Sequence, residues 1–268
     1  MRKASGQSLP LGADWMYRVV SEDRPGGPQL PWETVRGYTT IHNAMISPLT
    51  GFPLYAAIWY QGESHADRGM AYQPLLERLV KSWRAYFGAN LPVVIVQLPG
   101  YDSMPDSPGP SGWSDIREAQ RRVGVDDPNT GLAATIDAGD RTDSHPPNKQ
   151  LVVQRILHVL DILTGQSQAA EVGIVPVRVV RDGSGISLEM PTEQLKVIGS
   201  ASPIAFETCD ESGNCNWANA TLNGTVIDLF VPSQTNPSEV RYCWGDAPIC
   251  NLFSGDDVPV SPFRLELE

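Results

Sequence analysis

The sequence is short of basic residues and has no long apolar run. Its 268 residues contain 20 Lys and Arg against 31 Asp and Glu, which gives a formal net charge of -11 at pH 7. A surface of that sign repels phosphate backbones and anionic lipids, so we expect neither nucleic acid nor membrane among the partners. No apolar run reaches the roughly 18 residues that a membrane-spanning helix needs.

The first residues lack the apolar stretch of a secretory signal peptide. Arg2 and Lys3 supply positive charge, but polar and small residues follow them. We therefore expect no targeting segment in this chain.

Neither disorder nor a helix bundle fits the composition. Hydrophobic residues make up 41% and charged residues 19%, which is typical of a soluble globular protein. The 24 glycines and 23 prolines predict many turns and short strands. A chain of this length can bury a substantial core, in one large domain or two smaller ones.

The cysteines are few, and all lie in the last part of the chain, at Cys209, Cys215, Cys243 and Cys250. Pairing in chain order would close two short loops, and this clustering indicates a local disulfide framework, although three pairings are possible. One alternative is a zinc site, but the C-x2-C spacing and the nearby histidines that are typical of zinc are absent. The other alternative is a set of reduced, partly buried thiols.

Apolar runs of strand length alternate with helical patterns in the first part of the chain. We predict strands at 54–60, 91–96 and 132–136, and helices at 69–87, 113–123 and 148–163. This alternation indicates βαβ units and a parallel sheet.

The pattern changes after Gly165, where short β segments separated by turns follow at 175–180, 186–190 and 226–231. The fold class we predict is α/β: a partial parallel sheet with flanking helices, followed by a small C-terminal β-sandwich. We expect two domains, residues 1–168 and residues 169–268.

Polar residues follow each of the three predicted strands. Gln61 and Glu63 follow the first strand, Gln97 ends the second, and an acidic segment up to His145 follows the third. Ligands bind beyond the carboxyl ends of parallel strands, so we place the candidate site at this edge of the sheet.

His145 is the candidate general base. A catalytic histidine needs an acceptor at its far ring nitrogen, and a carboxylate fills this role while stabilising the imidazolium. Asp143, Asp140 and Asp137 all lie shortly before His145, and the loop geometry decides which of them reaches the ring. The structural alternative is an acidic, solvated loop with an exposed histidine.

The segment after the first strand has two chemical interpretations. Ser64 could be the serine of a nucleophile elbow, but an elbow needs a helix directly after the serine, and we predict a loop up to about Met70. Gln61 could instead donate its side-chain amide to an oxyanion, with Glu63 in an orienting role. The structural alternative is that these polar groups satisfy the loop backbone.

Two further interpretations rest on residue type alone. His42, His65 and His145 could bind a metal, although no two of them have ligand spacing on one element. Glu63 with an aspartate could form the acid–base pair of a glycosidase.

Several segments over about residues 30–268 form a recognisable series: 42–49 (HNAMISPL), 58–64 (IWYQGES), 83–84 (WR), 96–98 (VQL), 117–120 (REAQ), 136–140 (IDAGD), 143–149 (DSHPPNK), 240–244 (VRYCW) and 259–264 (PVSPFR). In order and in approximate spacing, these segments resemble the sialate O-acetylesterase family of the SGNH hydrolase superfamily.

The resemblance implies an SGNH-type sheet and an esterase that removes acetyl groups from sugar hydroxyls, with an acetylated carbohydrate as substrate and no cofactor. A serine attacks the acetyl carbonyl, and a histidine takes its proton and passes it to the leaving sugar oxygen. By position, His145 resembles the catalytic base, Asp143 its orienting partner, Gln61 the oxyanion amide and Glu63 a supporting residue. Where the family has an asparagine after this signature, the chain has His65.

The nucleophile departs from the family pattern. The family's serine lies in a Gly-Gln-Ser-Asn block after the first strand, whereas here Gly6, Gln7 and Ser8 precede Leu9 and follow no strand pattern. Neither Ser8 nor Ser64 matches that block, so we expect the esterase domain to be N-terminally incomplete. Two functions follow: a carbohydrate O-acetylesterase with a serine/histidine mechanism, or an inactive homologue acting at most as a sugar-binding or interaction module.

The clustered cysteines, the family and two sequons, at Asn219 and Asn223, predict a secreted or lumenal glycoprotein with disulfides.

Overall fold

The structure is a computed structural model that describes residues 39–167, 173–182, 185–232 and 236–267. The chain divides into two compact units, Met1–Phe52 and Pro53–Glu268. In the described part of the first unit, η1 (His42–Ile46) and η2 (Ser47–Leu49) form two short helical turns.

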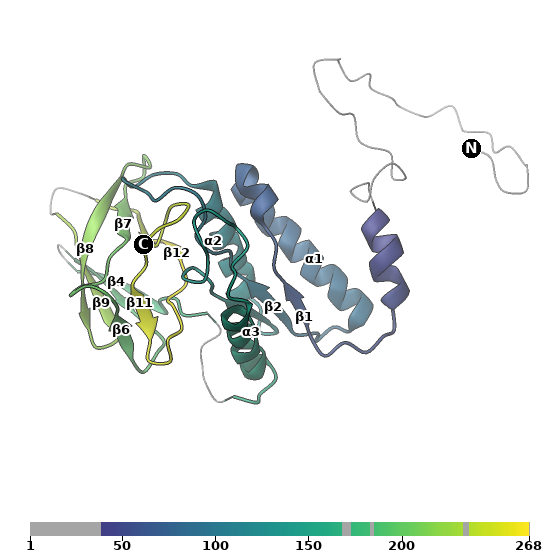
Figure 1. Ribbon diagram of the computed structural model, residues 1–268. Coiled ribbons are helices and arrows are strands. Elements are labelled where there is room, and N and C mark those ends of the chain that lie inside the picture. The colour runs from purple at the N-terminus through teal and green to yellow at the C-terminus, as the bar shows by residue number, and fades with distance from the viewer. Residues whose placement is uncertain (1–38, 168–172, 183–184, 233–235, 268) are drawn as a thin grey trace, which may run out of the picture. The chain divides into compact units, whose positions relative to one another are not determined.

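A three-stranded parallel sheet forms the first half of this unit, in the order β1-β2-β3. Its elements run β1 (Ala57–Trp59), η3 (Glu63–Ala71), α1 (Tyr72–Phe87), β2 (Val93–Val96), α2 (Gly112–Val125), β3 (Thr130–Ala133) and α3 (Lys149–Leu163). Figure 1 shows the strands side by side with the helices packed along them. The predicted strands and helices of this half are confirmed, and their bounds differ from the expected ones by a few residues.

The two faces of this sheet are both buried, which explains the continuous apolar runs in its strands. Val93 and Ile95 of β2 pack with the apolar stripes of α1 and α2. Val94 and Val96, which point to the opposite face, pack against α3. Polar caps start α2 and α3: the side chain of Ser111 accepts from the Ser114 amide, and that of Asn148 accepts from the Leu151 amide.

The second half of the unit is β-rich, as predicted. Its strands are β4 (Arg178–Asp182), β5 (Gly185–Glu189), β6 (Leu195–Val197), β7 (Phe206–Cys209), β8 (Cys215–Asn223), β9 (Val226–Phe230), β10 (Glu239–Tyr242), β11 (Leu252–Ser254) and β12 (Phe263–Glu266). Seven of them form one antiparallel sheet in the order β12-β10-β7-β8-β9-β5-β4, and β11 pairs with β6. The predicted boundary at residue 168 stays a prediction, since Pro53–Glu268 forms one compact unit.

The long strand β8 lies in the middle of this sheet and joins its two ends. Its first residues, Cys215 to Ala218, pair with β7, and the residues from Asn219 to Asn223 pair with β9. Side chains from both ends, among them Phe206 of β7 and Leu229 of β9, enter one hydrophobic core. The sheet therefore encloses its core from two sides, in the manner of a sandwich.

Two disulfides join the cysteines in chain order, Cys209 with Cys215 and Cys243 with Cys250. This confirms the disulfide framework and excludes both the zinc site and the reduced thiols. Cys209 and Cys215 are direct partners across β7 and β8. Among the described residues, the one grouping of potential metal ligands is Glu207 with these two cysteines, and the disulfide occupies both sulfurs.

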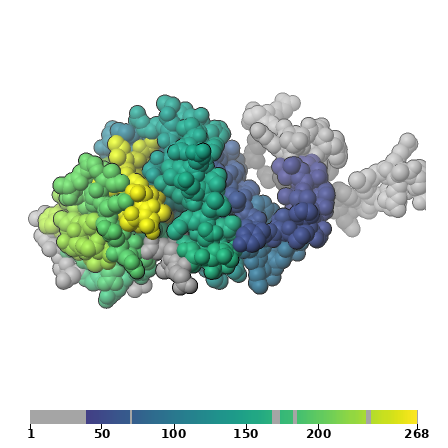
Figure 2. Space-filling view, turned by 60° about the horizontal axis from the view of Figure 1, so that its bottom comes forward, coloured from purple at the N-terminus to yellow at the C-terminus, as the bar shows by residue number. Residues whose placement is uncertain are grey.

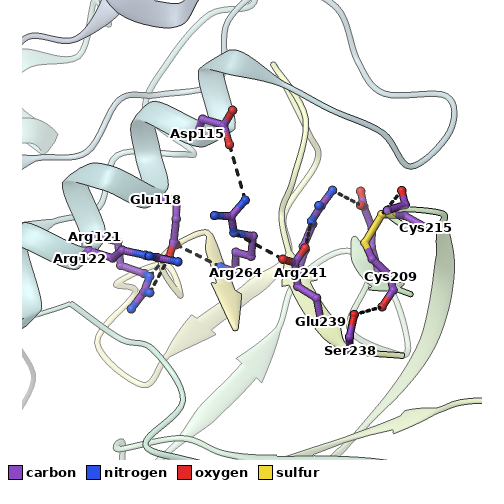
Figure 3. Close-up of polar contacts among 12 residues, drawn as sticks. Asp115, Glu118, Arg121, Arg122, Cys209, Cys215, Ser238, Glu239, Arg241 and Arg264 are labelled. Atoms are coloured by element: carbon purple, nitrogen blue, oxygen red, sulfur yellow. Dashed lines mark hydrogen bonds and ion pairs between the residues drawn. A yellow bond between two sulfur atoms is a disulfide. The ribbon is translucent and has the colours of Figure 1, made fainter. Parts of the chain in front are cut away.

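A network of charged residues joins α2 to the β-rich half (Figure 3). The backbone amide of Arg264 donates to Glu118 at 3.1 Å, and its guanidinium lies 3.9 Å from Asp115 and 3.5 Å from Glu239. Arg241, which is opposite Arg264 on the neighbouring strand, continues the network toward the β7 strand. These contacts explain why a helix rich in charged residues is largely buried.

Figure 2 shows the C-terminal residues, in yellow, along the boundary between the teal helical half and the green β-rich half. Among the described residues, none of the helices combines the length and the hydrophobicity that crossing a bilayer requires.

Candidate active site

The residues after the three parallel strands meet at the carboxyl edge of the sheet. Tyr60, which directly follows β1, contacts the first residue of α3, because the ammonium group of Lys149 lies 5.9 Å from the centre of its ring. The loop that carries His145 ends at this same helix. Gln97 is different, because its side chain is fully buried and donates to the carbonyls of Arg117 and Pro262. Gln97 therefore serves structure at this edge.

His145 contacts Asp143 through its ring. The distance between His145 Nδ1 and Asp143 Oδ1 is 2.9 Å, and the same oxygen accepts from the backbone amide of His145 at 2.8 Å. These two hydrogen bonds, the backbone one first, lower the pKa of Asp143, so its carboxylate is charged at neutral pH. Both side chains face solvent, with 79% of the His145 side chain and 62% of the Asp143 side chain exposed.

The two other candidate aspartates have different partners. Asp140 accepts from the backbone amide and the hydroxyl of Thr142, at 2.8 and 2.7 Å, and so closes a tight turn. Asp137 forms a two-pronged ion pair with Arg155 of α3, at 2.5 and 2.6 Å. Of the three carboxylates, the one at Asp143 reaches the imidazole ring.

The peptide unit between Gln61 and Gly62 is bonded on both sides. The carbonyl of Gln61 accepts from the Tyr72 hydroxyl at 2.5 Å and from the Gln120 amide at 3.1 Å. The backbone amide of Gly62 donates to the Glu63 carboxylate at 2.8 Å. A Cβ at Gly62 would lie 2.7 Å from Ile116, so this close approach of α2 requires glycine. The side-chain amide of Gln61 is partly exposed and is not used for these bonds.

The segment after Glu63 differs from its expected conformation. It is not a loop, because η3 forms one tight helix over Glu63–Ala71, and α1 begins only at Tyr72. Ser64 lies exposed on η3, and the ring of His65 packs against Tyr72 at 5.4 Å between centroids. His65 is thus engaged in packing, and the grouping of potential metal ligands found among the described residues includes neither His65 nor His145. Ser8 lies outside the described residues.

Four residues that hold this site were missed as site residues: Trp59, Tyr72, Arg117 and Gln120. Arg117 is fully buried and donates to backbone carbonyls of the loop after β10, and burial lowers its pKa to about 9. Arg117 and Gln120 both lie in the REAQ segment that carries the resemblance, which is the signal that could have found them.

Three comparisons with known proteins all match acetylesterases that act on carbohydrates or sialate. A family model described as "Carbohydrate esterase, sialic acid-specific acetylesterase" matches residues 25–152. Sialate O-acetylesterase from Mus musculus is 27% identical over 94% of this chain and 50% of its own length, and the Homo sapiens enzyme is 26% identical over 80% and 48%. The crystal structure of a carbohydrate acetylesterase from Xanthomonas citri superposes with a TM-score of 0.76, at 31% identity, over 85% of this chain and 54% of that one.

The fold and these matches define the chain as a carbohydrate esterase relative with an SGNH-type sheet. More narrowly, the sequence matches are to the sialate O-acetylesterase family. The chain spans about half the length of the curated relatives that it matches.

Proposed function

We propose that this protein hydrolyses acetyl esters on carbohydrate hydroxyl groups, with His145 as general base, Asp143 as its orienting partner and Gln61 as an oxyanion donor. The observation that carries the proposal is the 2.9 Å contact between His145 Nδ1 and the Asp143 carboxylate. This contact engages one ring nitrogen and leaves Nε2 to accept a proton. Glu63 has a supporting role, because its carboxylate bonds the backbone next to Gln61.

The proposed reaction has two half-reactions. A serine oxygen bonds to the acetyl carbon while His145 takes the serine proton, and the resulting oxyanion receives a hydrogen bond from the Gln61 amide. The carbon–oxygen bond to the sugar then breaks, and His145 gives its proton to the sugar oxygen. In the second half, His145 takes a proton from water as the water oxygen bonds to the acetyl carbon. The carbon–oxygen bond to the serine then breaks, His145 gives its proton to the serine oxygen, and acetic acid leaves and ionises to acetate.

The test measures release of acetate from an O-acetylated sialic acid and from an aryl acetate. His145→Ala is expected to lower kcat by at least about a thousandfold, because it removes the proton carrier. Asp143→Asn should lower kcat less severely, and Asp140→Asn, a matched change in the same loop, should leave it unchanged. Hydrolysis that survives in His145→Ala would refute the assignment. Peptide mapping after labelling with a serine-reactive phosphonate identifies the nucleophile, including Ser8 and Ser64.

A second candidate function is sugar binding without hydrolysis. The observation in its favour is the set of hydrogen bonds made by the His145 ring. In the described part of the chain these go to Asp143 and to Ser144, and Nδ1 makes both of them. No described hydroxyl therefore occupies the position of a nucleophile on Nε2. Calorimetry that shows sugar binding in a chain without acetate release would favour this function.

We also propose a secreted or lumenal location, where an oxidising environment maintains disulfides. Two disulfides support this, as do the exposed sequon residues Asn219 and Asn223 on β8. Expression with a secretory leader in a glycosylating host, followed by mass spectrometry of both asparagines, tests this proposal.

A further inference from the structure

The peptide unit between Gln61 and Gly62 is held by hydrogen bonds to three side chains. Its carbonyl accepts two side-chain hydrogen bonds, from Tyr72 and Gln120, which come from different helices. The amide of the same peptide unit is bonded by Glu63. Every polar atom of this peptide unit thus has a partner, and the donors and acceptors are all side chains.

The two donors are themselves held in place. Gln120 is fully buried, and its other amide atom, Oε1, accepts from the backbone amide of Leu98 at 2.9 Å. Gln120 therefore joins the segments that follow β1 and β2. The hydroxyl of Tyr72 accepts from the indole N–H of Trp59 at 2.8 Å. Burial raises the pKa of Tyr72, so the hydroxyl keeps its proton and donates at neutral pH.

An oxyanion donor is effective only when it is already in place as the charge develops. A glutamine side chain has several rotatable bonds, so its amide is placed well only if the backbone that carries it is fixed. In this chain the next residue, Gly62, is closely surrounded, since a Cβ added there would lie 2.7 Å from Ile116 and 3.2 Å from Leu98.

We infer that Tyr72 and Gln120 are positioning residues that fix the Gln61 amide for oxyanion stabilisation, an inference that rests on the proposed function. They act through the Gln61 carbonyl and touch no reacting atom. Their loss should therefore weaken binding of the transition state and leave binding of the substrate nearly unchanged.

The lead variant is Tyr72→Phe, which removes the hydroxyl and keeps the ring. The second is Gln120→Glu, which keeps an acceptor for the Leu98 amide and removes the donor to the Gln61 carbonyl. Each should lower kcat by about tenfold or more while KM stays within about twofold. Tyr86→Phe on α1 and Gln154→Glu on α3 are matched changes at exposed positions and should change neither constant.

A double-mutant cycle separates positioning from general loosening of the fold. In a Gln61→Ala background, Tyr72→Phe should cause no further fall in kcat, because the group that it positions is already gone. An additional fall of the full size would overturn the inference, and so would a change in KM alone. Thermal denaturation of each variant confirms that the rates refer to folded protein.

The same assays distinguish this inference from the proposed function. If wild type hydrolyses acetyl esters and His145→Ala does not, but Tyr72→Phe and Gln120→Glu are fully active, the positioning inference is wrong and the proposed function stands. If wild type releases no acetate, the proposed function fails, and the inference fails with it.

Discussion

Glu207 should make the protein less stable as the pH rises through neutrality. This residue lies on β7 with 1% of its surface exposed, and among the described residues neither carboxylate oxygen accepts a hydrogen bond. The nearest positive charge is the guanidinium of Arg241 at 4.0 Å, and Glu239 adds negative charge nearby. Burial raises the pKa of Glu207 from 4.5 to about 7, and the attraction of Arg241 offsets only part of this effect.

The sign and size of the effect of Glu207 on the free energy of unfolding follow from the linkage between folding and proton binding. A carboxyl whose pKa is higher in the folded state binds its proton more tightly there, so its favourable contribution is complete below pH 4.5. That contribution disappears as the pH rises from 4.5 to about 7. A shift of this size corresponds to at most about 3 kcal/mol of unfolding free energy.

The perturbation is Glu207→Gln, which keeps the shape of the side chain and removes its titration. Unfolding in urea, measured at several pH values from about 4 to 8, gives the stability of both proteins. The free energy of unfolding of wild type minus that of the variant should fall by about 2–3 kcal/mol across this range. Using this difference cancels Asp143 and the other carboxylates with lowered pKa, which act in the opposite direction.

Glu193→Gln, at an exposed position, is the matched control and should leave the pH dependence unchanged. If Glu207→Gln and wild type have parallel stability curves, Glu207 is not a titrating buried acid, and the reasoning from its burial is wrong.

Two further changes test the packing around the site. Arg117→Met should lower the free energy of unfolding by about 3 kcal/mol, because it leaves buried backbone carbonyls without their donor; a loss below about 1 kcal/mol in urea unfolding would contradict this. Gly62→Ala should lower the free energy of unfolding by about 1–3 kcal/mol, because the added methyl group overlaps with Ile116, and it should also lower kcat. Unchanged stability and unchanged hydrolysis would contradict this, since they would show that α2 moves aside at little cost.

The parallel half of the fold could be predicted because its signals are local. Strands buried on both faces appear as continuous apolar runs, and the helices between them carry a regular apolar stripe. The third strand was placed late, at 132–136, although pairing with Val93–Val96 sets it at Thr130–Ala133. Thr130 is a polar residue, so the sequence does not mark it as part of a buried strand. In the structure its hydroxyl accepts a hydrogen bond from Arg84, which lies far away along the chain.

Strands of the β-rich half were missed where their charged residues have distant partners. Glu207 in β7, Arg241 in β10 and Arg264 in β12 interrupt the apolar alternation. Arg241 lies 4.0 Å from Glu207, and Arg264 contacts Asp115 and Glu118 of α2. A single sequence does not show such partners, because the contact of Arg264 with Glu118 joins residues 146 positions apart.

The candidate site likewise contains residues that the sequence predicts and residues that it does not. His145 and its loop were identified from their place after a strand, but three aspartates could have been the partner. Local geometry excludes Asp140, which caps its own turn, and a residue of the next helix, Arg155, engages Asp137. The supporting residues Tyr72 and Gln120 act through the backbone of Gln61, a contact that residue type and spacing do not reveal.

The hydrogen bond from the Gln97 side chain to the Pro262 carbonyl has a consequence for the order of folding. Gln97 leaves the ribosome 165 residues before its acceptor, Pro262, which lies just before β12. The parallel sheet can pair its strands as soon as they emerge, but the edge that carries the proposed chemistry stays incomplete until the C-terminal strand has docked. We therefore expect the sheet to form during synthesis before its carboxyl edge has all of its hydrogen bonds.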